Sequence, residues 1–143
     1  MSESRDRRAQ FGWAFYDWAN SAFATTVVAG FFPIFFKSYW SSGHPAETST
    51  LQLGVGSALA SLVVLVLAPL LGAVADRSRR KKPWLALATG ISVAATAGLF
   101  FVGEGQWLFA LTLFVIASAA FFLAMVFYDS LIVDVASPAD YDR

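Results

Sequence analysis

The chain has 143 residues, of which 57% are hydrophobic and 14% are charged, against roughly half and a quarter in ordinary globular proteins. This excess of apolar side chains argues against a soluble domain. Ten acidic and ten basic residues cancel, so the net charge indicates no class of partner. The chain has no Cys and a single His, which excludes a disulfide framework, a thiol nucleophile and a Cys- or His-rich metal site. We therefore expect no metal and no cofactor.

Four apolar stretches are long enough to cross a bilayer, because a membrane-spanning helix needs about 20 mostly apolar residues. Too little polar sequence remains to cover four such helices in a soluble protein. We therefore predict an all-α integral membrane protein with four transmembrane helices. The predicted parts are a cytoplasmic tail at 1–12, a transmembrane region at 13–133 with spans at about 13–36, 52–75, 84–102 and 107–132, and a cytoplasmic tail or loop at 134–143.

The positions of the basic residues predict how the chain is oriented, because Lys and Arg gather on the cytoplasmic side of membrane spans. Nine of the ten lie before the first predicted span, between the second and third, or after the fourth; the two other connections hold only Lys37. Both termini are therefore predicted to be cytoplasmic, in the cell (inner) membrane. Trp and Tyr favour the headgroup layer and support the same boundaries: Trp13, Trp18, Trp84 and Tyr128 at one face, and Tyr39, Trp40 and Trp107 at the other.

Small residues predict where helices approach closely in lipid. The candidates are Gly54 with Ala58 and Gly56 with Ala60 in the second span, Ala86, Gly90, Ala94 and Gly98 in the third, and Ala120 with Ala124 in the fourth. Two prolines, Pro33 and Pro69, lie inside the first and second spans and should bend their helices. A static bend is favoured over a hinge at both.

Two carboxylates within the predicted spans need an explanation, because an ionisable side chain in a bilayer costs about 2.5–3.5 kcal/mol on insertion scales. Asp17 lies about one turn into the first span, with Asn20 and Ser21 on the same helical face. Asp129 lies in the last turns of the fourth span. If the predicted topology holds, both are in the cytoplasmic half. They could line a substrate or proton pathway, or they could pair with cytoplasmic Arg residues; for Asp129 we favour pairing.

No hydrolytic constellation accompanies these residues. Ser21 lacks a His base on its side of the membrane, since His44 falls in a predicted outer loop. The sequence therefore predicts that the chain is not an enzyme, and that no catalytic residue is present.

The segment between the second and third spans resembles a signature of the major facilitator superfamily. It begins at Gly72 and runs as Gly-x-x-x-Asp-Arg-x-x-Arg-Lys, with Arg79 in place of the second Gly of the family pattern. The tail from Asp134 to Arg143 resembles the acid-Pro-acid-Arg run that follows helix four in the same superfamily. The residues that carry the resemblance, and that would form a gating loop motif, are Gly72, Asp76, Arg77, Arg80, Lys81 and Asp134.

The opening segment, Trp13-x-x-Tyr16-Asp17-x-Ala-Asn-Ser-Ala-Phe followed by Phe32-Pro33, resembles the first helix of the vacuole-effluxer-like branch of that superfamily, whose yeast members are autophagy-related amino-acid effluxers. The resemblance implies helices one to four of a twelve-helix fold. It also implies that Asp76 braces a helix of the other half, and that Asp134 pairs with Arg77 or Arg80 in the outward-open state.

The predicted function is accordingly the N-terminal part of a secondary active transporter that moves a small polar solute, possibly an amino acid, by alternating access. The alternative is a self-contained four-helix membrane protein that dimerises as a small transporter or a scaffold. The expected partners are the bilayer, a small-molecule substrate, protons, and either the missing C-terminal helices of a parent chain or a second copy. No nucleic acid is expected.

Overall fold

The computed structural model describes residues 3–78 and 81–135. Within this described part the chain forms helices and short connections, with no strand. Four helical stretches are long and apolar enough to cross a membrane, and the all-α class with four spans is therefore confirmed. These stretches are Ala14–Trp40, Ala46–Val74, Lys81–Phe101 and Trp107–Leu131.

The chain divides into two compact units, Met1–Phe35 and Phe36–Arg143, and each is described by itself. The first unit is a continuous helix made of α1 (Glu3–Ala22), the π-helix η1 (Phe23–Phe31) and α2 (Phe32–Phe35). The second unit contains the π-helix η2 (Phe36–Trp40), α3 (Ala46–Ser78), α4 (Lys81–Gly98), the 3-10 turn η3 (Leu99–Phe101) and α5 (Trp107–Val135).

The first unit changes its hydrogen-bond register ahead of Pro33. In an α-helix the Pro33 ring would clash with the carbonyl four residues earlier and would offer that carbonyl no N–H. In η1 the bonding instead reaches back five residues, as in the Phe32 N–H donated to the Val27 carbonyl. The disturbance expected at Pro33 therefore takes the form of a widened helix.

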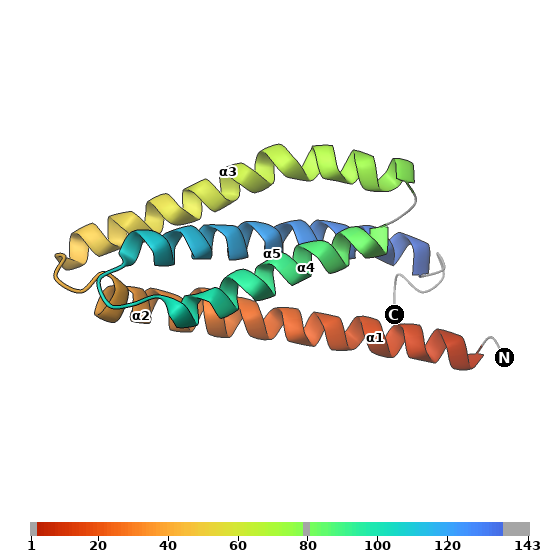
Figure 1. The fold of residues 1–143 in the computed structure, drawn as a ribbon. Coiled ribbons are helices and arrows are strands. Elements are labelled where there is room, and N and C mark those ends of the chain that lie inside the picture. The colour runs from red at the N-terminus through yellow and green to blue at the C-terminus, as the bar shows by residue number, and fades with distance from the viewer. Residues whose placement is uncertain (1–2, 79–80, 136–143) are drawn as a thin grey trace. The chain divides into compact units, whose positions relative to one another are not determined.

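Helix α3 continues as an α-helix past Pro69. Figure 1 shows its ribbon changing direction in the second half, which contains this proline. A missing backbone hydrogen bond is the ordinary cause of such a bend.

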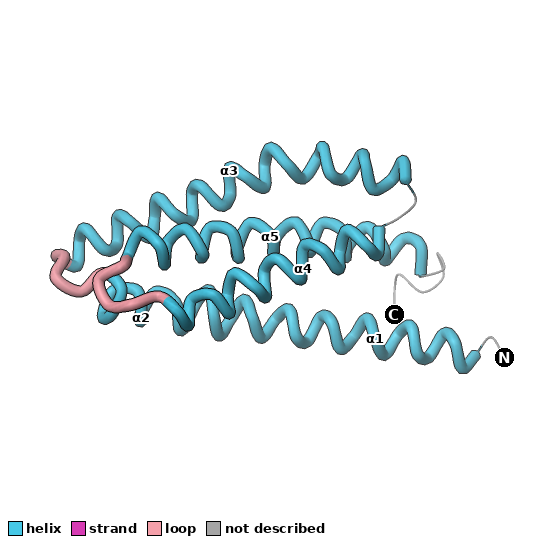
Figure 2. Tube along the Cα trace, in the orientation of Figure 1, coloured by secondary structure: helices cyan, strands magenta, loops and turns pink. Residues whose placement is uncertain are grey.

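The helices extend beyond the spans predicted from hydropathy. Helix α3 begins at Ala46, within the stretch read as a polar connection, and Glu47 lies in its first turn. An acid favours a helix N-terminus because of the helix dipole. The connections are correspondingly short, and Figure 2 shows the loops at 41–45 and 102–106 at the same end of the second unit. We call this the loop end.

Helix α5 is the centre of the second unit. It packs extensively against α4 and α3, which touch each other little, and Figure 1 shows it between them. Gly56 makes the α3 contact possible, because a Cβ built there would lie 2.5 Å from Leu111 Cδ1. Ala60, Ala120 and Ala124 are also buried. The predicted small-residue contacts of the second and fourth spans are therefore confirmed, through Gly56 and Ala60 rather than Gly54 and Ala58, which are exposed.

The predicted contact stripe of the third span is confirmed at Gly98, where a Cβ would lie 3.4 Å from Leu113 Cδ1 of α5, and is wrong for packing inside this chain at the other three residues. Ala86, Gly90 and Ala94 are exposed, and the face of α4 buried in the unit carries Ala88, Ser92, Ala95 and Leu99. The Ser92 hydroxyl donates to the Ala117 carbonyl of α5 at 3.0 Å. A hydroxyl in an apolar setting needs a partner, and this requirement favours the Ser92 face over the equally small Gly90 face.

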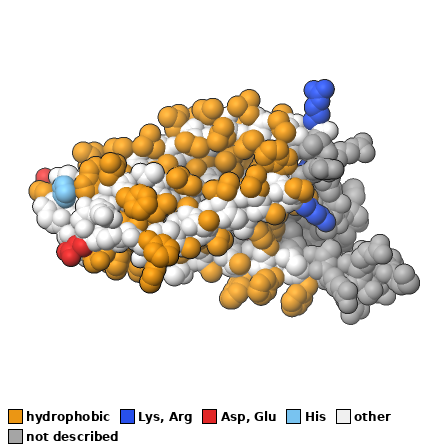
Figure 3. Space-filling view, in the orientation of Figure 1, with side chains coloured by type: hydrophobic (Ala, Val, Ile, Leu, Met, Phe, Trp, Pro, Cys, Tyr) orange, Lys and Arg blue, Asp and Glu red, His pale blue; other side chains and the backbone are white. Residues whose placement is uncertain are grey.

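The surface of the second unit separates by side-chain type. Figure 3 shows hydrophobic side chains over the visible lengths of the helices, the His and acidic side chains at the loop end, and Lys or Arg at the opposite end. We call the opposite end, which carries Arg77, Lys81 and Lys82, the basic end.

Gly56 provides a test of the α3–α5 contact. We expect Gly56→Leu to lower the free energy of unfolding by roughly 1–3 kcal/mol, because the added side chain overpacks a filled interface. Gly54→Leu is the matched control, since nothing lies within 4 Å of a Cβ at Gly54. The measurement is the thermal unfolding midpoint of each variant in detergent. Equal midpoints for the two variants would contradict the observed helix pairing.

Candidate functional site

The first unit carries the polar residues predicted for a pathway. The segment from Asp17 to Ser21 is α-helical, so that Asp17, Asn20 and Ser21 share a face as expected. Asp17 and Ser21 are exposed, and Asn20 is half-buried. The Asp17 carboxylate has no hydrogen-bond or ion-pair partner among the residues that the structure describes. A carboxylate in this position can accept a proton or bind a positively charged group.

Thr25 extends this row by a further turn, and sequence reasoning missed it. Its Oγ1 donates to the Ser21 carbonyl at 2.9 Å. Asp17, Ser21 and Thr25 are each four residues apart, so the row runs roughly 12 Å along the helix axis at about 1.5 Å per residue. The four-residue spacing was visible in the sequence and could have found it. We call Asp17, Asn20, Ser21 and Thr25 the polar row.

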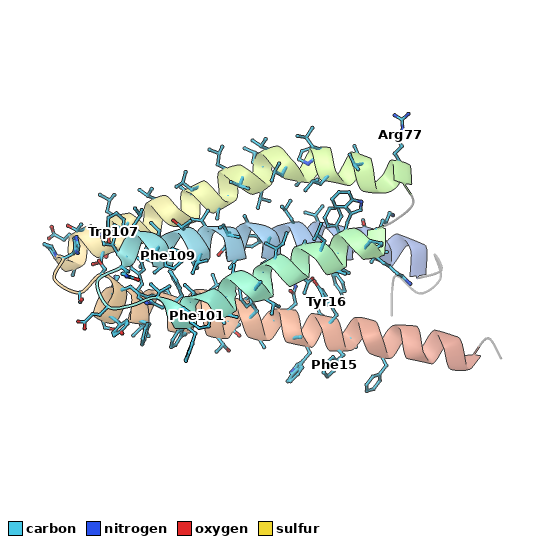
Figure 4. The ribbon with its side chains drawn as sticks, in the orientation of Figure 1. Phe15, Tyr16, Arg77, Phe101, Trp107 and Phe109 are labelled. Atoms are coloured by element: carbon cyan, nitrogen blue, oxygen red, sulfur yellow. The ribbon has the colours of Figure 1, made fainter. Side chains whose placement is uncertain are left out.

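The remainder of α1 near Asp17 is apolar. The rings of Phe15 and Trp18 lie 5.7 Å apart, and both are exposed. Figure 4 shows Phe15 and Tyr16 projecting from different sides of α1. The polar row is therefore confined to one side of a helix whose other side suits lipid.

Asp129, the second predicted carboxylate, is exposed on α5. It has no partner among the described residues. Its neighbour Ser130 donates a hydroxyl hydrogen bond to the Phe127 carbonyl at 2.7 Å. Pairing of Asp129 with a nearby Arg, and its position in the cytoplasmic half together with Asp17, both stay predictions.

The residues of the gating loop motif lie at the basic end. Gly72 lies in α3, and a Cβ there would meet nothing within 4 Å, so no described neighbour uses its small size. Arg77 is exposed, and Figure 4 shows it pointing away from the end of α3. The side chains of Asp76 and Asp134, and the whole of Arg80, lie outside the described part of the chain.

Lys81, a residue of the gating loop motif, forms a hydrogen bond to α5. It is the first residue of α4 and donates from Nζ to the Ser130 carbonyl of α5 at 3.0 Å. A cation near a helix C-terminus is stabilised by the helix dipole. This contact joins a Lys to a backbone oxygen, and the charge pairs that the resemblance implies between Asp134 and Arg77 or Arg80 stay predictions.

An apolar core holds the basic end of α3, α4 and α5 together. Ala88, Ala124 and Phe127 are buried there, with Leu71, Trp84 and Leu85 packed against them. The rings of Trp84 and Phe127 lie 6.3 Å apart. This core fixes the start of α4, and with it the position of Lys81.

At the loop end, two long-range hydrogen bonds join η2 to the connection before α5. Trp40 is 2% exposed, and its Nε1 donates to the Val102 carbonyl at 3.2 Å. The Gly105 N–H donates to the Tyr39 carbonyl at 3.2 Å. The Trp40 ring is enclosed by protein, and its predicted place at the depth of the headgroup layer stays a prediction.

A buried polar cluster accompanies these bonds. The Ser41 hydroxyl lies 2.9 Å from the Ser49 hydroxyl and 2.9 Å from Gln52 Oε1, so that it joins the loop to the first turns of α3. Gly43 and Gly105 have φ of 86° and 76°, values that favour glycine and allow both turns. His44 is exposed, with its ring 6.1 Å from that of Trp107. These contacts are structural and bring no reactive group together.

The described residues contain no group of three or more His, Cys, Asp or Glu side chains that could hold a metal ion. The polar row of the first unit offers a carboxylate, an amide and two hydroxyl groups.

Comparison with known proteins identifies the family to which this architecture belongs. Residues 46–139, more than half of the chain, match the family described as "Vacuole effluxer Atg22 like". The chain belongs to this family. It is also 37% identical over 132 residues to the "Uncharacterized MFS-type transporter YxiO" of Bacillus subtilis (strain 168). The match covers 92% of this chain and 31% of that protein. No solved structure matches the chain.

The Atg22-like chain is thus an integral membrane protein of a transporter family, and the resemblance seen in its sequence is confirmed. It spans about a third of the length of the relative that it matches. The part covered by the family match begins at the first residue of α3 and includes α4, α5 and the gating loop motif.

Lys81 allows a test of the contact at the basic end. We expect Lys81→Met to lower the free energy of unfolding by roughly 1–2 kcal/mol, because a hydrogen bond from a charged group is lost while the alkyl packing is kept. Lys82→Met is the control, since Lys82 is exposed and has no described partner. Thermal unfolding of both variants in detergent gives the comparison; a Lys82 effect as large as the Lys81 effect would rule out a specific bond.

Proposed function

We propose that this chain forms the N-terminal four helices of a secondary active transporter that moves a small polar solute, such as an amino acid, by alternating access. The observation that carries the proposal is the 37% identity to an MFS-type transporter over 92% of the chain. Transporters of this kind bind their solute near the bilayer midplane between two bundles of helices. The chain would supply part of one bundle, and the rest of a longer protein would supply the other.

The polar row supports a pathway along the first span. Charged and polar side chains in a membrane helix usually face a water-filled cavity or the interior of a bundle. Asp17, Ser21 and Thr25 follow one another at helical spacing, and Asp17 has no described partner. In this proposal Asp17 binds the solute or exchanges a proton with it, and Asn20 and Ser21 line the same passage. Asp129, in the second unit, is a second candidate for a group that binds the solute or exchanges a proton.

The distribution of basic residues supports a location in the cell (inner) membrane with both termini in the cytoplasm. In this orientation the basic end faces the cytoplasm and the loop end faces outward. The gating residues Asp76, Arg77, Arg80, Lys81 and Asp134 would then close the cytoplasmic side of the passage.

We expect Asp17→Asn to abolish flux while the protein keeps its expression level and thermal midpoint, because the amide preserves shape and removes the charge. The assay follows release of common amino acids from proteoliposomes containing the protein at the length it has in its native membrane. Glu47→Gln is the control, since Glu47 is an exposed acid at the start of α3. Normal flux in Asp17→Asn would remove Asp17 from the passage, and lost expression would assign it a structural role instead.

A self-contained four-helix protein that dimerises is the second candidate. The observation that favours it is the exposed small-residue stripe of α4, at Ala86, Gly90 and Ala94, which would let a second helix approach closely. The intact mass of the protein from its native membrane decides between the two. We expect a mass several-fold above 15.5 kDa in one chain; a mass near 15.5 kDa would favour the dimer.

A further inference from the structure

The middle of the first span has a backbone feature that the polar row does not include. The span runs over Ala14–Trp40, 27 residues, so its central residue is Val27, next to Val28. The π-helix η1 covers this centre, and Pro33 follows two residues after η1 ends. Both lie in the first unit, and π-helical turns occur frequently at functional sites.

The Val28 carbonyl loses both of its regular donors. In an α-helix its donor would be the N–H of Phe32, but that N–H is donated to the Val27 carbonyl. In the π register its donor would be the N–H of residue 33, and proline has none. The change of register and the proline together therefore leave this oxygen without a regular helical partner.

A carbonyl oxygen without a hydrogen-bond donor is energetically costly inside a membrane. An unsatisfied backbone group in the hydrocarbon core costs several kcal/mol, and irregular backbone is tolerated there only where protein buries it or where it lines a water-filled cavity. A backbone carbonyl that has lost its N–H donor also presents partial negative charge to its surroundings. In transporters, backbone carbonyls near the midplane that lack their helical donors bind cations.

The groups on the same helix favour a positively charged ligand. The Thr25 hydroxyl gives its proton to the Ser21 carbonyl, so its oxygen presents lone pairs to any further partner. Asp17 adds a carboxylate two turns closer to the N-terminus. From Asp17 to Val28 the helix therefore offers a succession of acceptors.

We propose that the Val28 carbonyl is a midplane acceptor for a positively charged group, either a metal cation or the ammonium group of the solute. The site rests on the proposed transport function and assigns it a chemical preference. A cationic group entering along the polar row would first bind the Asp17 carboxylate, then move to the Thr25 hydroxyl oxygen, and finally bind the Val28 carbonyl oxygen. Pro33 acts as a positioning residue, because it withholds the N–H that would otherwise fill the site.

Restoring this N–H gives the test. We expect NaCl or methylammonium chloride, each compared with choline chloride at equal concentration, to raise the thermal midpoint of the full-length protein by a few degrees. Choline controls for ionic strength and has no N–H to donate. Pro33→Ala should abolish the rise without lowering the starting midpoint, since alanine suits a helix interior better than proline. Pro69→Ala is the matched control in α3 and should respond like the unaltered protein.

The possible results distinguish a metal cation from an ammonium group as the ligand, and they test the Val28 site separately from the transport function. A response to sodium alone assigns a metal cation, and a response to methylammonium alone assigns an ammonium group. No response to either, or an undiminished response in Pro33→Ala, overturns the midplane acceptor, even where flux is normal. Absent flux with a Pro33-dependent response would overturn the transport function and keep the site.

An infrared measurement covers the case in which Pro33→Ala does not fold. Protein labelled with ¹³C-carbonyl valine is compared with and without the stabilising cation, and Val28→Leu identifies the contribution of residue 28. A shift of the labelled carbonyl band that disappears in Val28→Leu supports the site. Identical difference spectra for the two proteins would overturn it.

Discussion

In a lipid bilayer, each backbone N–H and C=O must find its partner within protein or enclosed water, because hydrocarbon offers none. The described spans are helical throughout, and the Val28 carbonyl ahead of Pro33 is a departure from that constraint. Several hydroxyl side chains within the spans turn back onto their own helix, whereas the buried Ser118 hydroxyl has no hydrogen-bond partner among the described residues. Thr50, Ser61, Thr96 and Thr112 each donate to the carbonyl four residues earlier. Where a hydroxyl instead leaves its helix, as Ser92 does, it fixes a helix–helix contact.

The same constraint explains how much of the fold was readable in the sequence. Hydropathy found the four spans because a helix is the only way for such segments to cross a membrane. It did not find the contact face of α4, because small residues occur on two of its faces. Gly90 and Ala94 have the spacing that small-residue packing favours, yet Ser92 and Ala95 are the ones buried. The spacing of small side chains is the same on the two faces and cannot distinguish them. The hydroxyl of Ser92 differs, because it forms a hydrogen bond to α5 when its face is buried.

The candidate site was predictable in part for a related reason. Asp17, Asn20 and Ser21 stand out because each is polar within an apolar run, and composition alone reveals that. Thr25 belongs to the same row, and its four-residue spacing from Ser21 is a signal that the analysis of single polar residues did not use. The π-helical hydrogen-bond register of η1 was not predictable. A proline such as Pro33 indicates that the helix is disturbed, but not whether it bends or widens. The loop end was also missed, because Trp40 bonds to Val102 across 62 residues of sequence.

That last separation has a consequence for biosynthesis. A chain is made from its N-terminus and folds progressively as it emerges. The acceptor for the Trp40 indole and the donor for the Tyr39 carbonyl are residues 102 and 105, which are synthesised only after α3 and α4. The first span therefore enters the membrane before the partners of its C-terminal end have been made. A truncation before residue 102 would remove both the acceptor of the Trp40 indole N–H and the Gly105 donor to the Tyr39 carbonyl, so that this end of the span could reach its final structure only after the third connection is made.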